Sequence, residues 1–126
     1  MKTILIVEDN EKNMKLVRDI LRHNGHATLE AQTGGDGVRM ASEKRPDLVL
    51  MDIQLPDIDG IEALRRLRED RALDAVPVIA VSASVMPDDQ QKIVTSGFDA
   101  FVTKPINLKQ FLDTVKRFLT HGRAAR

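Results

Sequence analysis

Short apolar runs alternate with longer amphipathic runs along the whole chain. The short runs have the length and the aliphatic, β-branched character of strands, and we expect strands at residues 3–7, 26–30, 47–51, 76–81 and 100–103. In the intervening runs apolar residues recur three or four positions apart, which predicts helices at about residues 11–24, 34–45, 60–70, 87–96 and 107–121. This alternation predicts an α/β fold, with a parallel sheet that carries helices on both faces.

The run at residues 76–81 is apolar throughout apart from Pro77 near its start. Unbroken apolar runs are typical of strands that are covered on both faces, as in parallel sheets. No linker or low-complexity segment divides the chain. We therefore expect one domain at residues 1–122 and a short C-terminal tail at residues 123–126, because Gly122 is placed to end the last helix.

The second helix is preceded by the glycine-rich stretch Gly34-Gly35-Asp36-Gly37. A phosphate-binding loop needs the spacing Gly-x-Gly-x-x-Gly or a Gly-Lys-Ser/Thr motif, and this stretch has neither. We therefore interpret it as a flexible start of a helix. Other helices begin with ordinary capping residues, such as Asn10 before the first helix and the pair Asp59 and Glu62 before the third.

The composition narrows the class of protein. Lysine plus arginine and aspartate plus glutamate number 19 each, so charge gives no reason to expect nucleic acid or an anionic membrane as a partner. The absence of cysteine excludes disulfides, thiolate catalysis and thiolate metal sites. No apolar run approaches the roughly 20 residues needed to span a bilayer, and the N-terminus lacks the pattern of a signal peptide. We expect a cytoplasmic protein.

Acidic residues stand at the carboxyl ends of two predicted strands. Asp52 ends the apolar run 48–51, and Glu8 and Asp9 follow the run 4–7. Because the carboxyl ends of parallel strands meet at one edge of the sheet, three carboxylates should gather there. Two carboxylates about 4 Å apart repel by roughly 4 kcal/mol at an effective dielectric constant near 20. A divalent cation removes this cost, and oxygen-only ligands favour Mg²⁺ or Ca²⁺ over zinc.

A hydroxyl and a lysine end the next two strands, as Ser82 and Lys104. Mg²⁺ usually keeps several waters and is completed by a substrate phosphate, so this set of residues predicts phosphoryl transfer with Asp52 as the nucleophile. Lys104 would then pair with one phosphate oxygen and Ser82 would donate a hydrogen bond to another. Taken singly, the lysine could be a surface residue and the serine could satisfy a backbone group. Together with the acids they favour a phosphoryl-transfer site.

These residues resemble those of bacterial response-regulator receiver domains, and the resemblance covers essentially the whole chain. The matching motifs are Ile6-Val7-Glu8-Asp9-Asn10, Leu50-Met51-Asp52-Ile53-Gln54-Leu55-Pro56 with Asp59-Gly60, Ser82-Ala83, and Lys104-Pro105. The resemblance implies a flavodoxin-like (βα)5 doubly wound fold with a five-stranded parallel sheet in the order 2-1-3-4-5. The sequences of the first and third motifs are most similar to those of single-domain receivers of the DivK type, which control cell-cycle kinases.

The resemblance also implies a role for each residue near the acids. Asp52 would accept the phosphoryl group. Asp9 and Asp52 would bind Mg²⁺ directly, together with the backbone carbonyl of Gln54, while Glu8 would act mainly through water. Glu8 stands where aspartate is commoner in the family, a substitution that keeps the chemistry. Gln54 and Ser84 occupy positions that tune dephosphorylation.

A second group of residues corresponds to the switch of the family. Ser82, which stands where threonine is commoner, would move toward the phosphoryl group with Ala83 beside it, and Lys104 would pair with that group. Phe101 matches the aromatic residue that changes its rotamer, although an ordinary buried phenylalanine is the alternative. The bond between Lys104 and Pro105 is cis in the family, which an X-Pro bond permits.

The resemblance implies a histidine kinase or a histidine phosphotransfer protein as the donor and a protein effector downstream. Phosphorylation of Asp52 would change the face formed by the last two helices and the fifth strand. Because no output domain follows residue 126, we expect output through a protein contact or onward phosphotransfer, from a monomer or a weak homodimer. The chain would then be a switch that catalyses only its own phosphorylation and dephosphorylation, and not an enzyme in the usual sense.

Three other functions compete with this interpretation. A phosphohydrolase of the haloacid-dehalogenase type uses the same nucleophile and metal, but it needs a second acid where this chain has Gln54. A flavodoxin-like electron carrier needs a hydroxyl- and glycine-rich loop where this chain has Glu8-Asp9-Asn10, and it needs aromatic residues, whereas Trp and Tyr are both missing here. A receiver that acts as an interaction module without phosphorylation stays compatible with the sequence.

Overall fold

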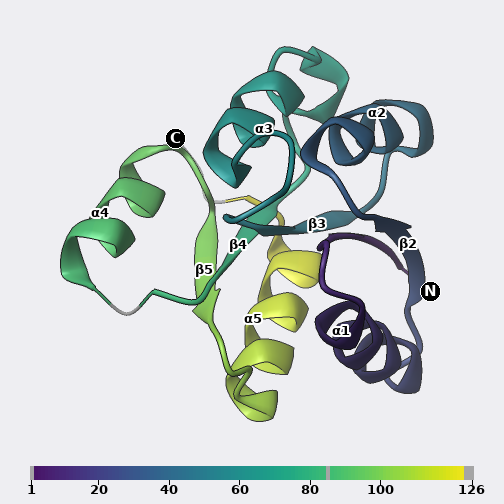
Figure 1. Cartoon of the computed structure of the whole chain (residues 1–126). Helices are drawn as coiled ribbons and strands as arrows, with labels where there is room; N and C mark the ends of the chain where they lie inside the picture. The colour runs from purple at the N-terminus through teal and green to yellow at the C-terminus, as the bar shows by residue number, and fades with distance from the viewer. Residues whose placement is uncertain (1, 85, 124–126) are drawn as a thin grey trace.

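The computed structural model describes residues 2–84 and 86–123. Within these ranges five strands alternate with five α-helices, and a short 3-10 helix precedes the fourth strand (Figure 1). The strands are β1 (Thr3–Val7), β2 (Ala27–Ala31), β3 (Leu48–Asp52), β4 (Val78–Ser82) and β5 (Ala100–Thr103). The helices are α1 (Glu11–His23), α2 (Gly34–Lys44), α3 (Gly60–Leu67), η1 (Arg71–Leu73), α4 (Pro87–Thr95) and α5 (Leu108–His121).

The strands form one parallel sheet in the order β2-β1-β3-β4-β5, which confirms the predicted fold class and strand order. From β1 the chain moves outward to β2 and then returns across the sheet to β3, β4 and β5. The order therefore reverses between β1 and β3, and the crevice at their carboxyl ends is where doubly wound sheets bind ligands. In this central region Val7 is in register with Met51, and Asp52 with Val81.

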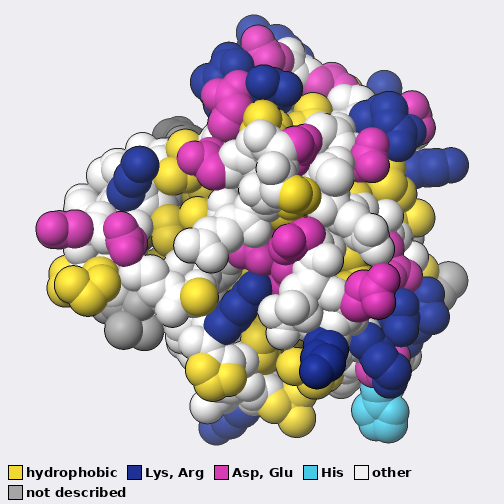
Figure 2. Space-filling view, in the orientation of Figure 1, with side chains coloured by type: hydrophobic (Ala, Val, Ile, Leu, Met, Phe, Trp, Pro, Cys, Tyr) yellow, Lys and Arg dark blue, Asp and Glu magenta, His cyan; other side chains and the backbone are white. Residues whose placement is uncertain are grey.

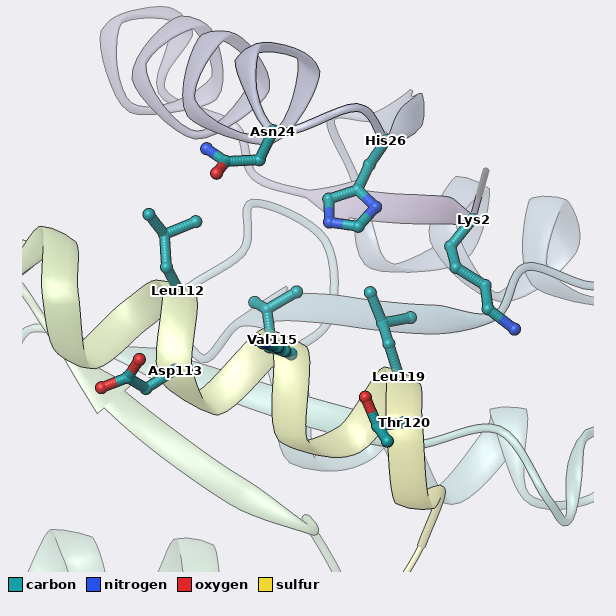
Figure 3. A pocket seen from close by; sticks show the side chains of 9 residues that line it. Lys2, Asn24, His26, Leu112, Asp113, Val115, Leu119 and Thr120 are labelled. Atoms are coloured by element: carbon teal, nitrogen blue, oxygen red, sulfur yellow. The ribbon is translucent and has the colours of Figure 1, made fainter.

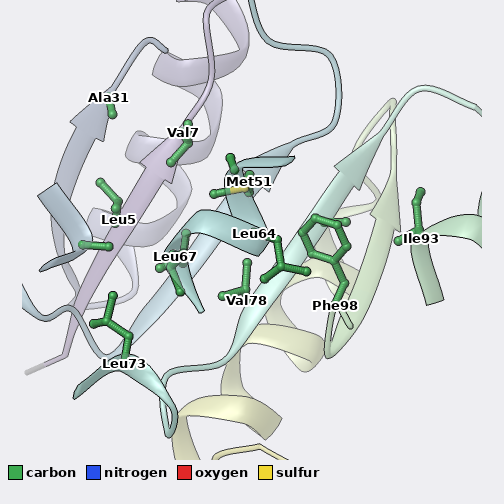
Figure 4. Close-up of a cluster of buried hydrophobic side chains, with 14 residues drawn as sticks. Leu5, Val7, Ala31, Met51, Leu64, Leu67, Leu73, Val78, Ile93 and Phe98 are labelled. Atoms are coloured by element: carbon green, nitrogen blue, oxygen red, sulfur yellow. The ribbon is translucent and has the colours of Figure 1, made fainter. Parts of the chain in front are cut away.

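Alternate residues of each strand point to opposite faces of the sheet and enter two separate cores. The core under α2, α3 and α4 contains the strand residues Leu5, Val7, Val49, Met51, Val78 and Ala80 (Figure 4). The core under α1 and α5 contains the strand residues Ile4, Ile6, Leu48, Leu50, Ile79, Val81 and Val102. Because helices cover both faces, the central strands β1, β3 and β4 are apolar at nearly every position and turn polar only at their ends, whereas the edge strand β2 carries Thr28 and Glu30 in its interior.

The second and third strands each begin and end one residue later than predicted. The His26 N–H donates to the Leu21 carbonyl at 3.1 Å, so this residue closes α1 before β2 starts. Asp47 lies outside β3 because its carboxylate accepts a hydrogen bond from the Thr3 N–H at 2.8 Å. At its other end β3 includes the acid Asp52, because this residue still pairs with Val81 of β4.

The segment between α3 and β4 differs most from the prediction. The helix that we expected to reach about residue 70 ends three residues earlier, and η1 follows. Asp70 caps this short helix by accepting a hydrogen bond from the Ala72 N–H at 3.0 Å. The Val76 N–H donates to the Leu73 carbonyl at 3.0 Å and Pro77 has no N–H, so β4 begins two residues later than expected.

The glycines at the start of α2 permit close packing, whereas we expected them to give flexibility. A Cβ atom at Gly37 would lie 2.7 Å from Val7 Cγ2, and one at Gly34 would lie 2.6 Å from Ile58 Cγ1. Both separations are far below van der Waals contact. The glycines therefore allow α2 to approach β1 and the connection between β3 and α3.

The C-terminal end of the described chain is held by the domain. Arg123, the first residue of the expected tail, places Nε 2.9 Å from Asp99 Oδ1 and donates from Nη1 to the Asp74 carbonyl at 2.7 Å. Asp99 also accepts a hydrogen bond from the Val78 N–H at 2.8 Å, so it joins this end to the start of β4. Residues 124–126 of the expected tail lie outside the described residues. None of the described helices is both long and apolar enough to cross a membrane.

Candidate functional site

The carboxyl ends of four strands bring the predicted site residues to one edge of the sheet. β3 ends at Asp52 and β4 at Ser82, while Glu8 and Lys104 directly follow β1 and β5. Backbone pairing continues across this edge, because the Glu8 N–H donates to the Ala31 carbonyl at 2.9 Å and the Lys104 N–H to the Ser82 carbonyl at 2.8 Å. The sheet itself therefore fixes where these side chains begin.

Glu8, Asp9 and Asp52 form an acidic cluster in which one carboxylate oxygen of each residue lies within 4.8 Å of the others. Glu8 and Asp52 are only 4% and 5% exposed, whereas Asp9 is open to solvent. Mg²⁺ binds through oxygen atoms, uses one or two carboxylates and keeps several waters. A cluster of carboxylates with one solvent-facing member fits these requirements.

The Lys104 ammonium bridges two of these acids. Its Nζ donates to Glu8 Oε1 and to Asp52 Oδ2, at 2.9 Å in each case. The peptide bond between Lys104 and Pro105 is cis. The ammonium offsets part of the negative charge of the cluster, and it is already in contact with the carboxylate predicted to react.

The cluster shifts the ionisation of its members. Burial and the interaction with Asp52 raise the pKa of Glu8 to about 7, although the Lys104 ammonium opposes the shift. Burial acts to lower the pKa of Lys104, but the hydrogen bonds to Asp52 and Glu8 outweigh it and raise that pKa. The cluster therefore favours the charged form of Lys104 and disfavours the charged form of Glu8.

The connection between β3 and α3 has a fixed shape beside Asp52. The Gln54 N–H donates to Asp52 Oδ1 at 3.1 Å, the Ile53 N–H to the Val81 carbonyl at 3.1 Å, and the Gly60 N–H to the Ile53 carbonyl at 2.8 Å. A Cβ atom at Gly60 would lie 2.5 Å from the backbone oxygen of Asp52, so this approach requires glycine. Together these contacts place the backbone of Gln54 next to the acidic cluster.

A hollow of about 380 Å³ opens over the cluster. The residues that line it are Glu8, Asp9, Asn10, Asn13, Asp52, Gln54, Leu55, Pro56 and Lys104. Figure 2 shows acidic side chains gathered near the middle of this face of the molecule, with a basic side chain beside them. Sequence reasoning missed Asn13 as a lining residue. Its spacing of three from the cap Asn10 places both on one side of the first turn of α1, and this spacing could have identified it.

The predicted switch residues flank the hollow. Ser82, Ala83 and Ser84 line a neighbouring, smaller hollow of about 180 Å³, and Gln54 lines both. The Ser82 hydroxyl oxygen accepts a hydrogen bond from the Ser84 N–H at 3.1 Å. Phe101 is half-buried on β5, against the core under α2, α3 and α4. The structure thus brings together the acids, Gln54 and the lysine, with the hydroxyls in the adjoining hollow, whereas Phe101 lines a different hollow beside α5.

A separate groove of about 500 Å³ lies at the opposite end of the sheet, between α5 and the connection from α1 to β2. Val115 and Leu119 of α5 face Asn24 and His26 across it (Figure 3). Asp113 is the one acidic member of the nine described residues that line this groove. It therefore lacks the clustered oxygen ligands found at the carboxyl ends of the strands.

A doubly wound sheet with an acidic cluster and a lysine at its carboxyl edge is the arrangement of a phosphoryl-accepting receiver. The family model described as response regulator receiver domain matches residues 4–116. The chain belongs to this family. Proteins of the family are signalling switches of two-component systems, which interact with histidine kinases and with downstream effectors.

Individual relatives agree with this assignment. The chain is 44% identical over 118 residues to the polar-differentiation response regulator DivK of Brucella anthropi, covering 94% of this chain and 96% of that protein. The receiver domain of a sensor histidine kinase from Pseudomonas aeruginosa PAO1 is 30% identical with a TM-score of 0.88, covers 94% of this chain and 98% of its own, and has a magnesium ion coordinated in its active site cleft. A receiver domain from a histidine kinase of Syntrophus aciditrophicus is 33% identical with a TM-score of 0.88, over 95% of this chain and 91% of the other.

The predicted family and class of function are therefore confirmed. The chain is a DivK-like receiver of a two-component system, and it works as a phosphorylation-based switch rather than as a classical enzyme. Receivers bind Mg²⁺ at their acidic site, and the acidic cluster of this chain is consistent with such a site.

Proposed function

We propose that Asp52 is the phosphoacceptor of this receiver. Its carboxylate ends the central strand β3 and lines the hollow over the acidic cluster. In the proposed reaction a carboxylate oxygen of Asp52 attacks the phosphorus atom of a phosphohistidine. A P–O bond forms while the P–N bond breaks, and the imidazole leaves with the electron pair and takes up a proton. The product is an aspartyl phosphate.

We further propose that Asp9, Asp52 and the backbone carbonyl of Gln54 hold Mg²⁺, with Glu8 acting through water. The support is that all four residues line one hollow and that their donors are oxygen atoms. When bound, the ion offsets negative charge on the phosphoryl oxygens. The protein supplies the orientation of the nucleophile, because the Gln54 N–H holds one oxygen of Asp52 and the ammonium of Lys104 holds the other.

In this proposal Lys104 and Ser82 recognise the phosphoryl group. Lys104 would exchange its contacts with the acids for a phosphoryl oxygen, and Ser82, with Ala83 beside it, would donate its hydroxyl hydrogen to another. Two charge-assisted bonds of roughly 1.5–3 kcal/mol each are of the order of the 5.5 kcal/mol that moves an equilibrium from about 1:99 to 99:1. Movement of Ser82 and of the Phe101 ring would then alter the face formed by α4, β5 and α5.

The single observation that carries the proposal is the bridge from Lys104 to Asp52 and Glu8, with Asp9 in the same cluster. The test is to incubate the protein with Mg²⁺ and acetyl phosphate or phosphoramidate and to measure the intact mass. The wild type and the control Asp113→Asn, which changes an exposed acid of α5, should each gain one phosphoryl group, and Asp52→Asn should gain none. No gain with either donor, and no binding of beryllofluoride, would overturn the assignment.

The proposed donor is a histidine kinase or a histidine phosphotransfer protein, and the proposed output is a protein contact or onward phosphotransfer by a monomer or weak homodimer. Similarity to a polar-differentiation regulator supports a role in the cell cycle or in cell polarity. The proposal includes a cytoplasmic location, where kinases have access to ATP. Gln54 and Ser84, which flank Asp52 and Ser82 at the two adjoining hollows, are the proposed determinants of the lifetime of the aspartyl phosphate.

A further inference from the structure

One side chain fastens the connection between β3 and α3 to a different helix. Asp57 Oδ1 accepts a hydrogen bond from the Gly34 N–H at 2.8 Å, and Asp57 Oδ2 accepts one from the Gly35 N–H at 2.9 Å. Gly34 and Gly35 are the first residues of α2, where unpaired N–H groups and the helix dipole favour an anion. The hydrogen bonds, led by that from Gly35, lower the pKa of Asp57 to about 2, so the carboxylate is ionised at every pH at which the protein would work.

Packing strengthens the same attachment. A Cβ atom at Gly34 would lie 2.6 Å from Ile58 Cγ1, so the residue after Asp57 sits directly on the start of α2. The connection is also closed at its two ends, because the Gly60 N–H donates to the Ile53 carbonyl at 2.8 Å. The hydrogen bonds from Asp57 therefore attach the middle of this connection to α2.

The attached segment forms one wall of the site. Gln54, Leu55 and Pro56 line the hollow over the acidic cluster, and Asp57 follows them directly. The backbone carbonyl proposed to bind Mg²⁺ belongs to Gln54, three residues before the attachment point. The position of that carbonyl is consequently set by Asp52 on one side and by Asp57 on the other.

We propose that Asp57 is a positioning residue for the metal site: by binding the N-terminus of α2 it holds the wall formed by residues 54–56 in place beside the acidic cluster. The inference rests on the proposed function of that cluster. Asp57 does not contact the cation and acts only through the backbone. Without it the middle of the connection keeps only the apolar packing of Leu55 and Ile58, and part of the free energy of Mg²⁺ binding is used to order it.

The test compares Asp57→Ala and Asp57→Asn with the control Thr33→Ala. The Thr33 hydroxyl caps the same helix by accepting a hydrogen bond from the Asp36 N–H at 3.1 Å, so its removal loosens the start of α2 but leaves the attachment of Asp57 in place. The readouts are the Kd for Mg²⁺ by calorimetry, the thermal midpoint, and the exchange rates of the Gly34 and Gly35 amides.

We expect Asp57→Ala to raise the Kd for Mg²⁺ about tenfold, the lower end of the range for residues that orient metal ligands. Asp57→Asn keeps one acceptor oxygen and should fall between this variant and the wild type. Thr33→Ala should lower the thermal midpoint with an unchanged Kd. In phosphorylation by acetyl phosphate, Asp57→Ala should need about tenfold more Mg²⁺ for half-maximal rate and reach the same rate at saturation.

A wild-type Kd in Asp57→Ala would overturn the inference, even with reduced stability. An equal rise of the Kd in Thr33→Ala would overturn it too, because helix stability alone would then explain the effect. If Asp57→Ala does not fold, the Kd of Asp57→Asn for Mg²⁺ takes its place: a raised Kd supports the inference and a wild-type Kd overturns it. If the wild type does not bind Mg²⁺, both the proposed metal site and this inference are overturned. Titration of the wild type alone shows this, whereas failure of the inference alone shows only in the variants.

Discussion

Lys104 Nζ lies 2.9 Å from Asp52 Oδ2, although 52 positions separate the two residues in the sequence. In the proposed site the ammonium and the metal ion would share this carboxylate, and the lysine is in place before any phosphoryl group arrives. Phosphorylation would not have to recruit Lys104 from solvent. It would only transfer an existing contact from the carboxylate to a phosphoryl oxygen a short distance away.

Replacing Lys104 by methionine should destabilise the metal-free protein and strengthen binding of Mg²⁺. Lys104→Met keeps the aliphatic stem but leaves Glu8 and Asp52 without their cation, which should lower the free energy of unfolding by about 1–3 kcal/mol. The ammonium no longer repels Mg²⁺, so the affinity for the ion should rise by roughly tenfold or more. Thermal unfolding with EDTA and with Mg²⁺, together with calorimetric titration, measures both effects.

Lys109→Met is the matched control. Lys109 is exposed on α5, so this substitution removes the same charge at a position away from the cluster. It should change neither the stability in EDTA nor the affinity for Mg²⁺. A Lys104→Met protein as stable in EDTA as the wild type would show that the bridge contributes nothing to the folded state.

The ionisation of Glu8 predicts how the stability of the metal-free protein depends on pH. Burial raises the pKa of Glu8 from 4.5 to about 7 in the folded state, so between these values the folded protein binds more protons than the unfolded chain. The contribution of Glu8 to the free energy of unfolding is therefore greatest below about pH 4.5. It decreases as the pH rises toward 7, by an amount on the order of 1–3 kcal/mol. Glu8→Gln should remove this part of the pH dependence in thermal unfolding with EDTA.

Mg²⁺ should reverse the trend, because carboxylates must be ionised to bind it and its stabilising effect therefore grows with pH. Glu69→Gln, which neutralises an exposed side chain of the same type, should keep the wild-type profile. If Glu8→Gln and the wild type lose stability equally over this range, a group other than Glu8 controls the titration.

The closeness of Gly60 to Asp52 makes the start of α3 intolerant of a side chain. In Gly60→Ala the new Cβ would lie 2.5 Å from the Asp52 carbonyl oxygen and 2.9 Å from Ile53 Cα, and both are backbone atoms. We expect a loss of about 2–3 kcal/mol in the free energy of unfolding and weaker binding of Mg²⁺, since the connection must move. Gly35→Ala is the control for stability alone, because its Cβ meets only a side-chain atom, Asp57 Oδ2 at 3.1 Å, and no backbone atom. Equal urea midpoints for the two variants would contradict this account.

The parts of the structure that could be predicted are those encoded by local pattern. Buried strands are apolar at every position, so the abrupt change to an acid at Glu8 and at Asp52 marked both the strand ends and the edge of the sheet at which they meet. Lys104 and Ser82 were predicted at the same edge because they too stand at the carboxyl ends of predicted strands. Capping residues such as Asn10, whose side chain accepts from the Asn13 N–H at 3.0 Å, located a helix start correctly.

The parts that could not be predicted depend on contacts between distant segments. Nothing in the sequence around Asp57 indicates that its carboxylate binds the start of α2, 23 positions earlier. The same holds for the pair of Arg123, which we placed in a tail, with Asp99 at 2.9 Å. Such contacts follow from how the helices pack on the sheet, so periodicity and spacing contain no signal for them.

The connection between β4 and α4 offers a test of the switch itself. The Ser84 hydroxyl donates to Asp89 Oδ2 at 2.6 Å, and the Ser84 N–H donates to the hydroxyl of Ser82. The bond to Asp89 holds Ser84, and Ser84 in turn holds the Ser82 hydroxyl where it is, so this chain of contacts opposes the proposed movement of Ser82 toward a phosphoryl group. Asp89→Ala, which removes about 1 kcal/mol of that stabilisation, should speed phosphorylation by acetyl phosphate up to about fivefold. Asp88→Ala removes an exposed acid from the same helical turn and should leave the rate unchanged. Equal rates in both variants would mean that helix charge, and not the bond to Ser84, governs the connection.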